Sequence, residues 1–220
     1  MNSDERNYKR FASMAQPHAW LLTAGNLFEQ SVVLRGRRGG SHLTRQSVAG
    51  ASITWDDVDR SVFLLGSFAL ENAIKAFLVY EHPSWISNGK LASGLRSHDL
   101  VQLRDTSTLI PYKARYGSVL ATFQQGMESW ARYPCALSAK TTVELPSMED
   151  ELWLRYLRLM SAYGKRLEVL LSKQWRGPHG LGGSYRFHGI GSLGSSPNRQ
   201  VAQRTTGAWP APLRLPARGS

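Results

Sequence analysis

The amino-acid sequence predicts an all-α protein: an up-and-down bundle of about five helices followed by a disordered tail. Apolar residues recur at steps of three and four over long stretches, which is the spacing of one helix face. Prolines and Gly/Ser-rich stretches separate those segments, as loops do. The periodicity ends near residue 173. We therefore expect a helical domain at residues 10–173 and a basic tail, rich in Gly, Ser, Pro and Arg, at residues 174–220.

The segment from Trp55 to His82 predicts a central helix around which the others pack. Apolar residues cover nearly its whole circumference, which is typical of a helix buried on several sides. Pro83 ends it, because proline cannot continue the backbone hydrogen bonds. Glu71 and Lys75 lie on a polar stripe of this helix, at the i,i+4 spacing that allows an ion pair. The pair either sits at an exposed edge or faces a groove, where it would meet a ligand or phosphate.

Further segments have helical periodicity, with prolines and capping residues near their ends. We expect these helices at about residues 19–34, 97–110, 113–131 and 147–171. Phe11 and Met14 indicate a shorter helix before the first. The polar face of the last helix is basic, and the negative end of the helix dipole explains much of this charge. The basic residues are Arg155, Arg158, Lys165 and Arg166.

Residues 35–52, RGRRGGSHLTRQSVAGAS, contain four arginines and four glycines between two predicted helices. This composition predicts a flexible basic loop. The loop is either a solvated connector or an arm that contacts phosphates.

A chain of 220 residues with 42% hydrophobic residues is long enough for one folded domain. Cys135 is its one cysteine, which excludes an internal disulfide and a multi-cysteine metal site. We therefore expect a cytoplasmic protein, whose thiols stay reduced. No apolar run follows the N-terminal residues, and no stretch approaches about 18 consecutive apolar residues. A signal peptide and a membrane partner are thus not expected.

The net charge of +11 is distributed unevenly along the chain. Residues 1–172 carry 20 lysines and arginines against 16 acidic residues, whereas residues 173–220 carry seven basic residues and no acidic one. Positive charge of this kind favours nucleic acid or another polyanion as a partner. The tail either binds nucleic acid weakly through its arginines or has no role.

The motifs of phosphate-binding loops, serine hydrolases, zinc proteases and Cys-x-x-Cys sites are missing from the sequence. No two of the six histidines have the i,i+3 or i,i+4 spacing of a helix-borne metal pair. We expect neither a metal nor a cofactor.

Three short segments, in this order and spacing, resemble the HEPN family of small bacterial helical domains. They are LGSFALENAIKAFLVYE at Leu65–Glu81, SHDLVQL at Ser97–Leu103 and WARYP at Trp130–Pro134. The resemblance covers about residues 55–134. It implies an all-α bundle, often a homodimer, that binds or acts on RNA or a nucleotide. It also implies a toxin–antitoxin or phage-defence context, with an antitoxin or a nucleotidyltransferase as a possible partner protein.

RNase members of that family use an arginine followed, after four to six residues, by a histidine on a helix that lines the dimer cleft. In this chain Arg37 and His42 have that spacing, as do Arg35 and His42, but they lie in the Gly-rich loop. The chain therefore departs from the catalytic pattern, and this match is weak. We assign no catalytic residue.

The remaining candidates for ligand or nucleic-acid binding lie at predicted helix ends. His98, beside Asp99 at a helix start, either bonds a phosphate or fixes the preceding loop as a capping residue. Arg132 and Tyr133 follow another helix. Arg132 either pairs with Glu71 or Glu128, or reaches a phosphate.

The leading hypothesis is a HEPN-like domain that binds RNA or a nucleotide without cleaving it. The first alternative is a metal-independent endoribonuclease with an unusual active site. The second alternative is a structural helical module that dimerises or docks a partner protein.

Overall fold

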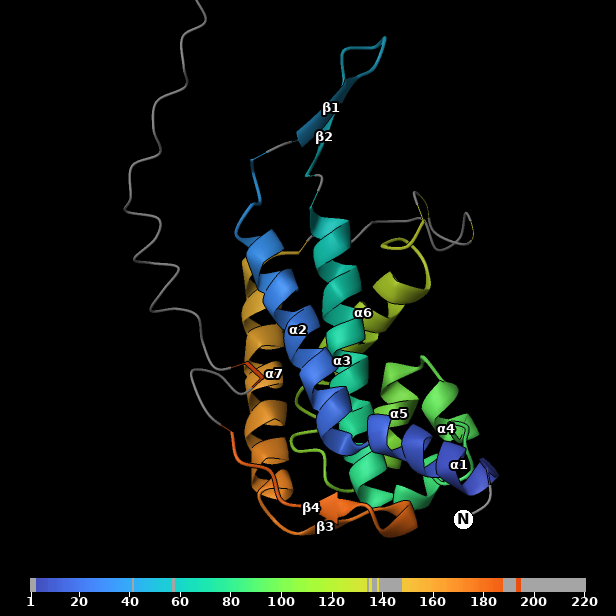
Figure 1. The fold of residues 1–220 in the computed structure, drawn as a ribbon. Coiled ribbons are helices and arrows are strands. Elements are labelled where there is room, and N and C mark those ends of the chain that lie inside the picture. The colour runs from blue at the N-terminus through green and yellow to red at the C-terminus, as the bar shows by residue number, and fades with distance from the viewer. Residues whose placement is uncertain are drawn as a thin grey trace, which may run out of the picture.

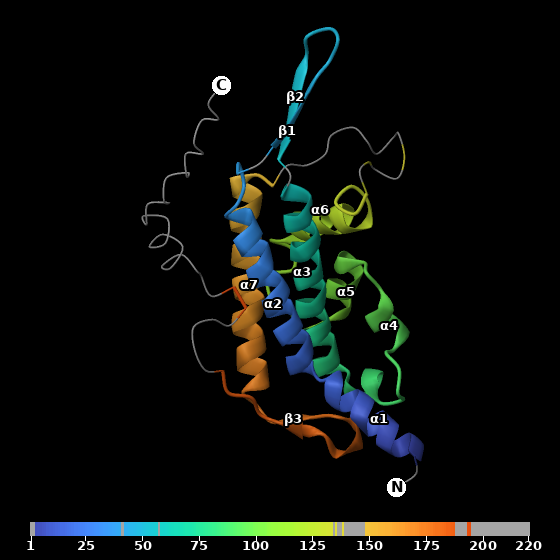
Figure 2. The ribbon, with the colours of Figure 1, turned by 45° about the horizontal axis from the view of Figure 1, so that its top comes forward.

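A computed structural model describes residues 3–40, 42–56, 58–133, 135, 138, 148–187 and 193–194 (Figures 1 and 2). In chain order the elements are α1 (Ser3–Met14), α2 (Pro17–Arg35), β1 (His42–Gln46), β2 (Ser52–Asp56), α3 (Asp59–Glu81), η1 (Pro83–Ile86), α4 (Ser93–Arg96), α5 (Leu100–Thr106), α6 (Gly117–Glu128), α7 (Asp150–Leu171), β3 (Trp175–Arg176), η3 (Pro178–Gly180) and β4 (Gly182–Gly183). Helices carry the fold, and the described strands form two small antiparallel sheets. The predicted all-α class is confirmed.

The central helix is α3, as the sequence predicts, and fourteen of its 23 residues are buried. Figures 1 and 2 show α2 and α7 on one side of α3, and α4 and α5 on the other. Gly66 lets α6 approach closely, because a Cβ there would lie 2.6 Å from the ring of Phe123. By length and composition α3 could span a membrane, but it is mostly buried within the bundle, as the core helix of a soluble protein would be.

The start of α3 differs from the prediction. The helix begins at Asp59, and Trp55 belongs to β2, where its backbone pairs with that of Leu43. Similarly, α6 begins at Gly117 and α7 at Asp150, each three or four residues later than expected. The apolar spacing located these helices correctly, while the backbone of the preceding residues follows a strand, a turn or an extended path instead.

The predicted flexible loop contains a β-hairpin. Strands β1 and β2 pair antiparallel from His42↔Asp56 to Gln46↔Ser52, and Gly50, at φ 82°, makes the turn. Every residue of β1 is exposed, and the hairpin projects away from the helices (Figures 1 and 2). We call residues 42–56 the arm. The expectation of a loop was wrong here, because the two segments pair through their backbones and the hydroxyls of Thr44 and Thr54 meet across the strands at 2.9 Å.

Ion pairs fix the base of the arm to the helices. Arg35, at the end of α2, bonds Asp150 at 2.5 Å, and Arg38 lies 3.5 Å from Asp59. Arg38 also donates to the backbone carbonyl of Met148 at 3.1 Å. These contacts join the end of α2 to the starts of α3 and α7, so two arginines of the basic segment are engaged within the fold.

The folded domain extends beyond both of its predicted limits. It begins within α1, before residue 10, and continues past residue 173. The side chain of Trp175 is buried and donates to the carbonyl of Tyr80 at 3.3 Å. The Tyr185 hydroxyl donates to Gln16 at 2.7 Å. Residues 174–187 of the predicted tail therefore belong to the fold, and the rest of it, apart from residues 193–194, lies outside the described residues.

Candidate functional site

Glu71 and Lys75 form an ion pair, but in neither of the two settings that the sequence allowed. Both side chains are buried, so the pair lies neither at an exposed edge nor in an open groove. The Lys75 ammonium donates to Glu71 Oε1 at 2.5 Å and lies 5.8 Å from the centre of the Trp20 ring. His98 Nδ1 lies 2.9 Å from Glu71 Oε2. Both carboxylate oxygens therefore have partners, as a buried charge requires.

We call Glu71, Lys75 and His98 the polar cluster. Its outer member, His98, keeps 66% of its side chain exposed. The contact ties the segment before α5 to the middle of α3. Asp99, next to it, caps α5 by accepting from the backbone N–H of Gln102 at 2.8 Å. Asp99 is thus the N-cap of α5, and its carboxylate has a structural partner.

Arg132 and Tyr133 lie away from the polar cluster. Both are exposed after α6, and the Arg132 guanidinium lies 5.8 Å from the centre of the Tyr133 ring. The carbonyl of Tyr133 accepts from Arg60, which precedes Glu71 by eleven residues of α3, or about 16 Å along the helix. Within the described residues no ion pair joins Arg132 to Glu71 or Glu128.

Neither weak Arg/His match lies on one helix: Arg35 is the last residue of α2 and pairs with Asp150. Arg37 lies in the turn after α2, and His42 is the first residue of β1. Both are exposed, at the base of the arm. The structure therefore does not place them as the helical pair that the resemblance describes.

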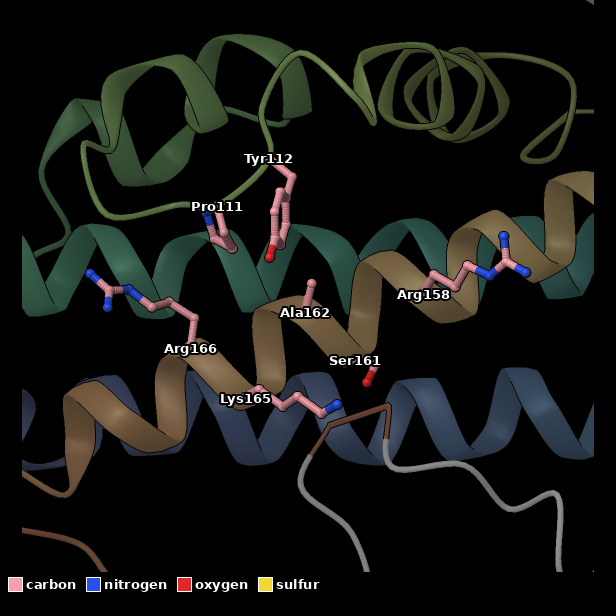
Figure 3. Close-up of a pocket in the computed structure, with 7 residues that line it drawn as sticks. All are labelled: Pro111, Tyr112, Arg158, Ser161, Ala162, Lys165 and Arg166. Atoms are coloured by element: carbon pink, nitrogen blue, oxygen red, sulfur yellow. The ribbon is translucent and has the colours of Figure 1, made fainter.

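A different set of residues forms an open cavity of about 520 Å³ beside α7. We call it the α7 groove. The residues that line it come from α7 and from the segment before α6: Pro111, Tyr112, Arg158, Ser161, Ala162, Lys165 and Arg166. Figure 3 shows Tyr112 pointing toward Ala162, with Arg158 on one side and Lys165 and Arg166 on the other.

The lining of the α7 groove is basic. Arg158 and Lys165 are exposed and make no ion pair in the part of the chain that the structure describes. Arg166 is half-buried, with its Nε 3.4 Å from the carbonyl of Leu109. None of the described residues that line the groove is acidic, and Glu168, the next acid along α7, pairs with none of these three within 4.0 Å. The cations therefore remain available to an anion.

Tyr112 stands out on the opposite wall. Its side chain is 62% exposed, and its backbone has φ 55°, in the left-handed region that bulky residues rarely adopt. Strained residues of this kind persist where the surrounding structure holds them, and they cluster at functional sites. The neighbouring segment explains how the strain persists: Ile110 is buried, and Arg166 bonds the carbonyl of Leu109.

The basic residues of α7 are visible in the sequence, where the negative end of the helix dipole was expected to explain much of their charge. The spacing of Arg158, Ala162 and Lys165 places two cations around a small residue on one face, which the sequence does reveal. The sequence does not predict that Tyr112 lies over that face, because Pro111 indicates only the end of a helix. The groove depends on a contact between segments some fifty residues apart.

Comparison with known proteins adds no assignment: no family model, no curated protein and no solved structure matches the chain.

Proposed function

We propose that this chain is a HEPN-like RNA-binding domain, which holds RNA, or a nucleotide, in the α7 groove without cleaving it. The observation that carries the proposal is the open groove in which Arg158 and Lys165 have no acidic partner among the described residues. Cations in a concave site concentrate an anionic ligand, and their contacts to phosphates release counterions. The chain's net charge of +11 acts in the same direction at longer range.

The chemistry of the groove supports binding rather than cleavage. RNA cleavage without a metal requires a general base near the 2′-hydroxyl. The lining residues that the structure describes include no histidine, aspartate, glutamate or cysteine. Ser161 supplies a hydroxyl, but the described residues that line the groove place no carboxylate, imidazole or thiolate beside it to act as its base. The described side chains of the groove can therefore neutralise phosphates, and they do not include the histidine or carboxylate that would most readily take a proton from the 2′-hydroxyl.

An endoribonuclease remains a second candidate, favoured by the polar cluster. The Glu71 carboxylate can orient the His98 ring through Nδ1, which leaves the other ring nitrogen to act as a base. The cluster joins α3 to the segment before α5, however, whereas the cations of the groove lie on α7. Figures 1 and 2 show α5 and α7 on opposite sides of α3. The cations of the groove would not serve this base, so the two candidates require different residues.

The test is filter binding of labelled oligouridine to the full chain at two salt concentrations. Arg158→Gln and Lys165→Gln should each weaken binding and reduce the slope of log affinity against log salt by about 0.7, the value for one phosphate contact on a single strand. Arg45→Gln removes the same charge from the exposed arm and should leave the slope nearly unchanged. If the variant that carries both Arg158→Gln and Lys165→Gln has the same affinity and the same salt slope as the wild type, the proposal is contradicted.

The same samples, run on a denaturing gel, test the second candidate. Intact RNA is the expected result. Cleavage that His98→Ala abolishes and Arg158→Gln preserves would establish the polar cluster as the active site. The toxin–antitoxin context rests on the resemblance alone, and the genes next to this one would test it: an antitoxin or nucleotidyltransferase neighbour would support it. If RNA does not bind at low salt, the docking or dimerisation module becomes the leading candidate.

A further inference from the structure

The segment that carries Tyr112 is attached to the fold on both sides. Before it, Ile110 is buried and the carbonyl of Leu109 lies 3.4 Å from Arg166 Nε. After it, the Lys113 ammonium donates to the backbone carbonyl of Asp105 at 3.3 Å and also to that of Ser107. The exposed, left-handed Tyr112 is therefore held over the groove rather than free to swing away.

The surroundings of this ring match the needs of a nucleotide base. Its floor is Ala162, a small residue, and the cavity of about 520 Å³ leaves room between the two walls. Arg158 and Lys165 flank it, separated by seven residues of α7, or about 10 Å along the axis. A positively charged groove that also offers an aromatic face is the arrangement by which proteins bind single strands: the base stacks, and the flanking phosphates meet the cations.

We infer that the α7 groove selects single-stranded RNA, with one unpaired base stacked on Tyr112 and the adjoining phosphates at Arg158 and Lys165. This inference rests on the proposed function. In an RNA duplex the bases are stacked on their neighbours and their faces are covered, so the ring has nothing to stack on. Duplex RNA therefore binds through the cations alone.

The experiment compares labelled oligouridine with the same strand annealed to oligoadenine, using the full chain. Tyr112→Leu should weaken single-strand binding on the order of tenfold or more while leaving duplex binding and the salt slope unchanged. Tyr112→Phe keeps the ring and should retain the preference for the single strand. Tyr112→Gly removes the ring and relieves the backbone, so it should lose that preference without unfolding earlier than the wild type. Tyr8→Leu, at an exposed tyrosine of α1, is the matched control.

The ratio of single-strand to duplex affinity is the deciding quantity, because a loss of folded protein would lower both affinities alike. If the ratio is the same in Tyr112→Leu and in the wild type, while Arg158→Gln still weakens binding, the inference fails and the proposed function stands. If Arg158→Gln and Lys165→Gln leave binding unchanged, the proposed function fails, whatever Tyr112 does. A ratio that falls in Tyr112→Leu and in Tyr112→Gly but not in Tyr112→Phe supports the inference.

Discussion

Glu71 lies inside the bundle, bonded to a cation through one oxygen and to an imidazole through the other. Burial removes water from all three partners except the outer part of His98, so the carboxylate depends on these two contacts. An arrangement of this kind is sensitive to the loss of one member and tolerant of the joint replacement of two. We therefore expect the polar cluster to contribute mainly to the stability of the fold.

Glu71→Gln should therefore lower the free energy of unfolding by about 3–5 kcal/mol, because it leaves the Lys75 ammonium buried without a carboxylate. Lys75→Met added to Glu71→Gln should recover much of that loss. Urea unfolding of the two single variants and the double variant measures the coupling. Losses that simply add would show that the two side chains do not depend on each other.

The sequence predicts the Glu71–Lys75 contact but not its burial. Spacing on a helix determines which side chains can meet, and that part of the prediction was right. Exposure depends on what packs against the helix, and the Trp20 ring of α2 covers Lys75. Likewise, His98 and Asp99 were recognised as residues of a helix start, while the link from His98 to Glu71 spans 27 positions and has no signal in the sequence.

At the scale of elements, the arm has little support from the helices. It is a two-stranded sheet whose β1 residues are all exposed, and an isolated hairpin is marginally stable in water. Its base is different, since Arg35 and Arg38 engage Asp150 and Asp59. The arm should open and close locally while the helices stay folded.

Replacing residues 42–56 by a short Gly/Ser linker should change the free energy of unfolding by no more than about 1 kcal/mol, because few contacts are lost. Circular dichroism should show the same helix signal, and thermal or urea unfolding should give the stability. Arg38→Gln is the informative comparison, since it keeps the arm but removes the bonds of Arg38 to Asp59 and Met148 at its base, and it should destabilise the domain more. A shortened chain that fails to fold would mean that the arm supports the helices.

The elements were predicted to different extents for a physical reason. A long helix has apolar residues at steps of three and four over many turns, so the sequence located α2, α3, α6 and α7 well. The strands of the arm are five residues long, and their alternation is too short to outweigh the glycines and arginines around them. Trp55 was consequently assigned to the central helix, although its backbone pairs with Leu43.

At the scale of the whole molecule, segments from the two ends of the domain lie together. The ring of His18, in the first turn of α2, stacks on that of Tyr185 with centroids 4.5 Å apart. Burial lowers the pKa of His18 below its ordinary value of 6.5, and its Nδ1 is buried without a hydrogen-bond partner in the described structure. The folded protein thus binds a proton at this ring less readily than the unfolded chain does.

The pH dependence follows from that difference. Between the lowered pKa of His18 and 6.5 the unfolded chain binds more protons at this residue than the folded protein does. The contribution of the neutral His18 ring to the free energy of unfolding is therefore fully present above about pH 6.5 and declines as the pH falls below that value. His18→Phe keeps an aromatic ring against Tyr185 and removes the titrating group, and should lose part of this decline. Melting temperatures of both proteins at pH 7.5 and pH 5.5 give the comparison. An equal decline in the variant would assign the effect to other groups.

The packing of Tyr185 near the start of α2 has a topological consequence. The Tyr185–Gln16 bond and the contacts of α1 with η3 make the first and last parts of the domain neighbours, whereas the arm lies at the far end of α2 and α3 (Figure 1). The chain path through the domain is therefore almost a closed ring. A circular permutant that joins these neighbouring parts and opens the ring at Gly50, in the exposed turn of the arm, would keep every helix–helix contact and change only their order along the chain.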